Sequence, residues 1–214
     1  MIMIGPAIAV ALLAGVGRQP DPGTEVLKLL AFGWCTEGRS RIAGAPPEVA
    51  KRVDEFASRC DLFRKENAKP RSDSGEGMAA AARWGYEGRL FAVTNGGGAD
   101  ASARDYVETL RPCYEWEGYS DCPEREAVFA DRYLARHPDG PFAAYLPLLG
   151  AHRWFCVAEA YEYEAKNHVR QGPGAVGLQE ARRRWKADLA KALRSPDPLV
   201  RFGAEALQQT GRCF

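Results

Sequence analysis

Residues 129–161 read FADRYLARHPDGPFAAYLPLLGAHRWFCVAEAY, and this stretch decides the fold. Its first part carries apolar side chains at steps of three and four, the spacing that gathers them on one face of a helix. Residues 137–141, HPDGP, combine two prolines with a glycine and predict a turn. The stretch therefore predicts a helical hairpin, in which one helix ends near His137 and a second follows the turn.

The second helix of this hairpin is predicted from about Phe142 to Lys166. It is the most apolar part of the chain after residues 1–17. Apolar side chains lie on two of its faces, so we expect neighbours on both sides and a central place in the fold. Pro147 is expected either to kink this helix or to mark its true start.

Further helices are expected on both sides of the hairpin. Asp121 is the predicted cap of the helix that ends near His137, and Asp197, just before Pro198, caps the last helix. Alternating, strand-like stretches are almost absent, so the predicted class is all-α, an irregular array of antiparallel helical hairpins braced by disulfides. The remaining helices are predicted at residues 25–34, 46–67, 78–93, 100–110, 175–194 and 198–209.

The hairpin at Phe129–Tyr161 resembles those of tetratricopeptide-like proteins. In that class a helix ends in a Tyr-Pro or His-Pro turn, and the next helix packs back with aromatic and small residues. Residues 187–207 echo the pattern more loosely, and the repeat of about 34 residues is not sustained. The resemblance implies stacked hairpins and a surface that binds peptides or proteins. The matching positions are Phe129, Tyr133, Leu134, His137, Pro138, Gly140, Tyr145, Leu149, Ala158 and Tyr161.

The first 17 residues, MIMIGPAIAVALLAGVG, carry no charge and resemble the core of a signal peptide. The apolar run from Ile4 to Val16 is too short to span a bilayer. Gly15 and Gly17 fit a cleavage site before Arg18. We expect residues 1–17 to be a signal peptide and residues 18–214 to form a single helical domain, secreted or periplasmic and not inserted in a membrane. No basic residue precedes the run, so the alternative is a buried first helix or a wrongly chosen start codon.

Six cysteines follow the expected cleavage point, and an even number in an exported chain favours disulfides over free thiols. Fifteen pairings are possible among six cysteines, and spacing alone does not choose between them. The alternative is that the cysteines bind zinc. The sequence has no Cys-x-x-Cys or His-x-x-x-His pair, which would supply two closely spaced zinc ligands. The pairings expected first are Cys113–Cys122, Cys35–Cys60 and Cys156–Cys213.

Four side chains that are able to bind a ligand or take part in a reaction share one face of the predicted central helix, because they follow one another at steps of four, three and four residues. They are His152, Cys156, Glu159 and Tyr163. We expect His152, Glu159 and Tyr163 to be the binding residues. Alternatively, Cys156 and His152 form a thiol–imidazole pair assisted by Glu159, or these three bind zinc. The structural alternative places His152 in the core and Cys156 in a disulfide, and pairs Glu159 with an arginine.

Two charged segments offer weaker candidates. Residues 114–131 are acidic and aromatic, and suit a cation, a basic peptide, a glycosidase carboxylate pair or simply a solvated loop. Residues 166–194 are basic and include the consecutive Arg182, Arg183 and Arg184. Consecutive helical residues point in different directions, so this run is expected to be a solvated surface rather than a site for nucleic acid.

The export-like start, the even number of cysteines, the helical hairpins and the lack of a catalytic motif favour a binding protein over an enzyme. The chain has 214 residues with a formal net charge of +1, which gives no overall attraction to nucleic acid or anionic membrane. It contains no catalytic signature. We expect an exported helical binding or scaffold protein with no cofactor and a protein or peptide partner. The alternatives are a small hydrolase or zinc protein using His152, Cys156 and Glu159, and a purely structural envelope component.

Overall fold

The computed structural model describes residues 42, 44–66, 118–140, 142–167, 176–211 and 213, with no side chains described from residue 59 to residue 66. Within these residues the fold is helical and contains no strand, in agreement with the predicted helical class. The helices are α3 (Pro47–Glu66), α6 (Asp121–Arg136), α7 (Leu146–Asn167), α8 (Leu178–Ala192) and α9 (Pro198–Thr210). The predicted signal peptide and the helices expected at residues 25–34, 78–93 and 100–110 lie outside the described part.

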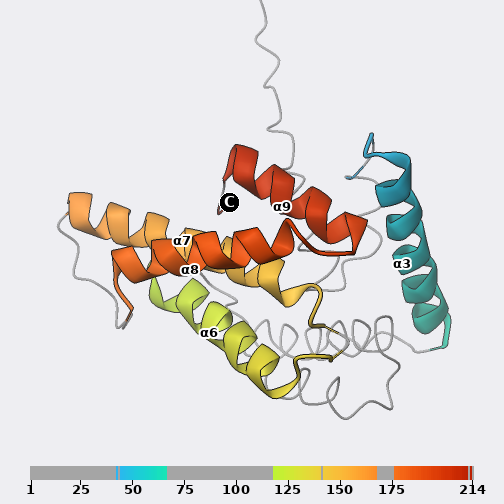
Figure 1. Cartoon of the computed structure of the whole chain (residues 1–214), viewed down its shortest axis with the longest axis horizontal. Helices are drawn as coiled ribbons and strands as arrows, with labels where there is room; N and C mark the ends of the chain where they lie inside the picture. The colour runs from blue at the N-terminus through green and yellow to red at the C-terminus, as the bar shows by residue number, and fades with distance from the viewer. Residues whose placement is uncertain are drawn as a thin grey trace, which may run out of the picture.

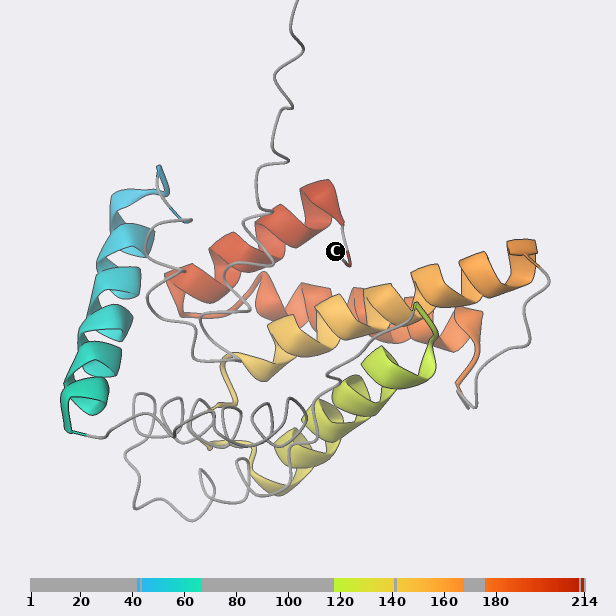
Figure 2. The ribbon, with the colours of Figure 1, turned by 180° about the vertical axis from the view of Figure 1, so that it is seen from behind.

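Helices α6 to α9 run back and forth, each reversing the direction of the one before it (Figure 1). Helix α7 packs against α6, α8 and α9, which confirms the central position expected from its two apolar faces. Helices α6 and α9 lie on opposite sides of the α7–α8 pair, and α3 stands at one end beside α9 (Figure 2). No helix of the described part combines the length and apolar character of a membrane span.

Proline and capping residues set the helix boundaries. Helix α7 begins at Leu146, so Pro147 lies in its first turn, where its missing N–H has no helical partner to lose. Helix α6 ends at Arg136, and His137 no longer has helical backbone angles. His137 precedes Pro138, and helical angles are disfavoured for a residue that precedes a proline. The prediction that Asp121 caps this helix is wrong, because Asp121 is the first helical residue. Its carboxylate lies at the positive end of the helix dipole, where a negative charge is stabilising.

The core has two parts. The larger joins α3, α6, α7, α8 and α9 through apolar and aromatic side chains, among them the fully buried Phe56, Tyr133 and Leu199. The smaller lies between α6, α7 and α8 around Trp154. Its ring is fully buried and faces the guanidinium of Arg184 from α8 at 4.8 Å. Burial of both faces of α7 explains why its sequence is so apolar.

A close approach between α7 and α8 depends on Gly150. A β-carbon added at this position would lie 2.6 Å from Asp188 Oδ2. The Asp188 side chain is buried and accepts a hydrogen bond from Lys191, which limits its movement. We expect Gly150→Ala to lower the free energy of unfolding by about 1 kcal/mol, since overpacking costs more than the gain in helix propensity.

The measurement is urea unfolding of Gly150→Ala alone and together with Asp188→Ala. Removing the carboxylate clears the space, so in the Asp188→Ala background the alanine is expected to be neutral or stabilising. An equal loss in both backgrounds would show that Asp188 is not what excludes the methyl group.

Candidate functional site

A disulfide joins the middle of the central helix to the end of the chain. Cys156 on α7 is bonded to Cys213, which follows the end of α9, and their Cα atoms lie 5.3 Å apart. Gly211 ends α9 with φ of +38°, a backbone conformation that glycine adopts at little cost. This turn lies against the ring of Phe155 on α7. The end of α9 is therefore held to α7 by a packing contact and a covalent bond.

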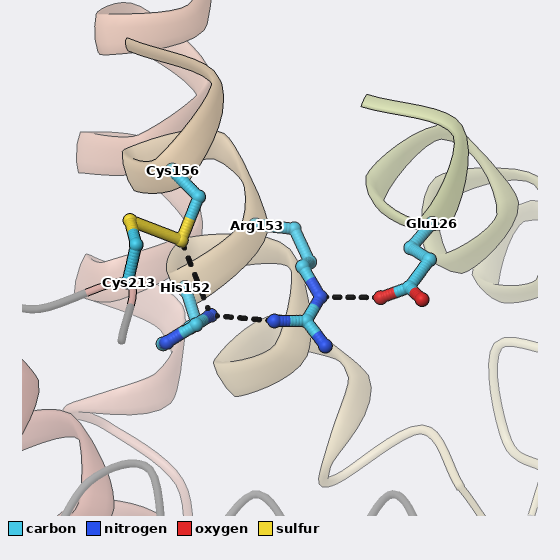
Figure 3. Close-up of a disulfide and its surroundings, with 5 residues drawn as sticks. All are labelled: Glu126, His152, Arg153, Cys156 and Cys213. Atoms are coloured by element: carbon cyan, nitrogen blue, oxygen red, sulfur yellow. Dashed lines mark hydrogen bonds and ion pairs between the residues drawn. A yellow bond between two sulfur atoms is a disulfide. The ribbon is translucent and has the colours of Figure 1, made fainter. Parts of the chain in front are cut away.

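The disulfide is the first member of a chain of polar contacts (Figure 3). Cys156 Sγ lies 3.6 Å from His152 Nδ1, one turn earlier on α7. The same Nδ1 lies 2.9 Å from Arg153 Nη1. Arg153 then donates from Nε to the carboxylate of Glu126 on α6 and forms an ion pair with it. The contacts thus run from sulfur through imidazole to a guanidinium and a carboxylate.

The chemistry of these groups fixes their roles. A guanidinium has no acceptor, so Arg153 donates and Nδ1 of His152 accepts. His152 then carries its proton on Nε2 when neutral. His152 and Cys156 are almost completely buried, and Glu126 is only 4% exposed. In such surroundings charges are screened far less than at a surface, so Arg153 and Glu126 attract each other strongly.

One disulfide is described with both of its cysteines. The Cys156–Cys213 bond is one of the three pairings suggested first. Cys122 is also disulfide-bonded, and its partner lies outside the described side chains. None of the cysteines with described side chains is free. The other predicted disulfide residues, Cys35, Cys60 and Cys113, are not among those described.

The predicted thiol–imidazole pair is not formed, because Cys156 carries no thiol while it is bonded to Cys213. The proximity of His152 and Cys156, one turn apart, is as the helical spacing predicts. Zinc ligation finds no support among the described residues either. In the described part of the chain, no three or more His, Cys, Asp or Glu side chains are grouped so that they could hold a metal ion.

The three predicted binding residues do not share one surface. His152 is buried beneath the disulfide, whereas Glu159 is exposed and Tyr163 is 60% exposed. Glu159 and Tyr163 are one turn apart, so these two remain neighbours on the outer side of α7. Tyr163 and Tyr119 are the only large hydrophobic side chains exposed in the described part of the chain.

Part of the acidic segment is buried, so of the possibilities for residues 114–131 the solvated loop does not apply to the part that lies in α6. Residues 121–131 belong to α6, and both Glu124 and Glu126 face inward. Glu124 Oε2 accepts a 3.4 Å hydrogen bond from Tyr161 of α7. Near them, Glu164 of α7 is fully buried and accepts from the backbone N–H of Ser120 at 3.1 Å. Sequence spacing could not reveal these partners, which lie on different helices.

The basic run is tied to carboxylates, as expected for a solvated helix surface. Arg182 pairs with Glu162 of α7, and Arg183 and Arg184 both donate to Glu180. These two hydrogen bonds lower the pKa of Glu180 to about 2. All three arginines are thus paired with carboxylates, Arg182 with α7 and the other two with Glu180 on their own helix.

Sequence reasoning missed Arg153 and Glu126. Arg153 lies three residues before Cys156, and this helical spacing was a signal that could have placed it beside the sulfur. Glu126 lies 27 residues before Arg153 on another helix, so only the packing of α6 on α7 reveals the pair.

Comparison with known proteins gives no relative to guide the interpretation. No protein-family model matches the chain, and neither a curated protein nor a solved structure does. The class that the fold defines is thus a helical one.

Proposed function

We propose that this chain is an exported, disulfide-braced array of helical hairpins, tetratricopeptide-like in its arrangement, that binds another protein or a peptide. The observation that carries the proposal is the Cys156–Cys213 disulfide. Disulfides persist in oxidising compartments and are rare where thiols are kept reduced. The apolar, uncharged start of the chain supports the same location, secreted or periplasmic.

The outer side of α7 near its end is the proposed binding surface. Tyr163 presents an aromatic side chain to solvent, and aromatic residues are enriched in the centres of protein interfaces. Glu159 lies one turn before it, and Glu162 is held by Arg182 of α8 beside it. An exposed ring between carboxylates suits a peptide or protein that brings an apolar side chain and a basic group.

A hydrolase is not proposed, since its nucleophile would be the sulfur that is bonded to Cys213. A purely structural envelope component remains the counter-hypothesis, and the binding experiment separates it from the proposal.

The location is tested on the full chain, expressed with its own amino terminus in a bacterial host. After cell fractionation, the protein is alkylated with and without reductant and its mass is measured. We expect an exported chain that begins at Arg18 and takes up alkylating reagent only after reduction. A cytosolic chain that begins at Met1, with six thiols open to alkylation, would overturn the proposal.

Binding is tested with a photo-crosslinking amino acid placed at position 163 in cells that make the protein natively. The matched control carries the same group at Glu205, which is exposed on α9. We expect a discrete adduct from position 163, absent at position 205 and reduced by Glu159→Lys. Equal or no adducts at both positions would favour the structural component.

A further inference from the structure

We propose that Cys156–Cys213 is a thiol–disulfide exchange site, at which an external thiol attacks Cys213 and Cys156 leaves as a thiolate beside His152 and Arg153. The ligand class is a thiol or dithiol, free or carried on a protein. The inference goes beyond the proposed binding function and does not depend on it.

Exposure makes the two cysteines unequal. Cys156 is completely buried in α7, whereas Cys213 is partly exposed after the end of α9. Exchange requires a thiolate to reach one sulfur, and access decides which sulfur is attacked. Attack therefore falls on Cys213, and Cys156 becomes the leaving group.

The surroundings of Cys156 favour its departure. A disulfide breaks faster when the leaving thiol is stabilised as a thiolate, and a neighbouring cation such as the guanidinium of Arg153 provides this stabilisation. His152 Nδ1 lies 3.6 Å from the leaving sulfur, and the Arg153 guanidinium is hydrogen-bonded to that same nitrogen. Glu126 partly neutralises Arg153 from α6 and so limits its effect.

The exchange balances with two external thiols. The first loses its proton to solvent, and its sulfur bonds to Cys213 while the Cys156–Cys213 bond breaks and its electron pair goes to Cys156. The second external thiolate attacks the first external sulfur, which releases Cys213 as a thiolate. Both protein thiolates then take up protons, so two external thiols become one external disulfide and the protein gains a dithiol. The end of α9 is no longer bonded to α7.

The test uses two variants that change the charge near Cys156 and are expected to change the rate of disulfide reduction in opposite directions. The oxidised full chain is treated with dithiothreitol, quenched by alkylation at intervals, and the reduction of Cys213 is followed by peptide mass spectrometry. Glu126→Gln removes the counter-ion and leaves Arg153 charged. The double variant Glu126→Gln, Arg153→Met removes both charges, which avoids leaving one of them buried alone. Cys122 lies one turn before Glu126 on α6 and feels the same charge changes, so the reference is Glu205→Gln, at an exposed position on α9.

A positive charge a few ångströms from a thiol lowers the pKa of that thiol by about one or more. We therefore expect Cys213 to be reduced about threefold faster than wild type in Glu126→Gln, about threefold slower in the double variant, and at the wild-type rate in Glu205→Gln. A purely structural role would instead speed reduction in both variants, because both would loosen the fold. Equal rates, or faster reduction in both, overturn the proposal.

A second measurement keeps the proposal open to refutation if the double variant does not fold. In Cys213→Ser, Cys156 is left as a free sulfur beside His152 and Arg153. We expect ultraviolet thiolate absorbance from it at neutral pH, increased on addition of Glu126→Gln, which leaves the charge of Arg153 without its carboxylate partner. Absence of thiolate absorbance in Cys213→Ser would show that the site does not stabilise the leaving group.

Discussion

Replacing Asp197 by alanine is expected to lower the free energy of unfolding by about 3 kcal/mol, because this side chain holds the start of α9 in two ways. Its Oδ1 accepts from the backbone N–H of Leu199 at 2.9 Å and so caps the helix. Its Oδ2 lies 3.0 Å from Nε of Arg52 on α3, in a pair whose side chains are only 12% and 18% exposed. Arg52 also donates to Tyr145 at 2.7 Å, so the loss reaches three parts of the fold.

Two variants separate the contributions, each measured by urea unfolding. Asparagine caps a helix as well as aspartate, so Asp197→Asn keeps the cap and is expected to lose only the ionic part, about half of the effect. Glu55 also pairs with Arg52, but at 3.7 Å and with 46% of its side chain exposed. We expect Glu55→Ala to cost less than about 0.5 kcal/mol. A similar loss from Glu55→Ala and Asp197→Ala would contradict the assignment.

The features that could be predicted from the sequence are those that depend on local spacing. The apolar faces of residues 142–166 predicted a central helix, and Asp197 before Pro198 predicted a capped start of α9, both of which the structure confirms. Such signals need only a few neighbouring residues, because helix geometry repeats within a turn.

The features that could not be predicted depend on packing between helices. Burial of His152 requires the surrounding fold, and the charge of Arg153 is balanced by a residue of α6. The role of Gly150 depends on Asp188 of α8, which lies 38 residues later in the sequence. For the same reason the spacing of His152, Glu159 and Tyr163 predicted one face but not which of them would be exposed.

Removal of the Cys156–Cys213 disulfide is expected to lower the free energy of unfolding by about 4 kcal/mol. The bond closes a loop with a sequence separation of 57 residues, and the entropy of that loop in the unfolded chain gives a loss of about this size. The loop contains the residues that form α8 and α9. Without the bond, these residues gain conformational entropy in the unfolded chain. Because the unfolded state then exposes more surface, the denaturant slope is expected to rise as well.

The measurement is urea unfolding of wild type and Cys213→Ser under non-reducing conditions, with the disulfide of Cys122 left intact in both. Cys213→Ser is the better variant because Cys213 is partly exposed, whereas a hydroxyl in place of the buried Cys156 would add a desolvation cost. Gln208→Ser, at an exposed position on α9, is the matched control and is expected to change stability by less than about 0.5 kcal/mol. If Cys213→Ser matched this control in both midpoint and slope, the bond would not brace the fold. The exchange at Cys213 would then be chemistry without a structural consequence, since opening the bond would leave the helices where they are.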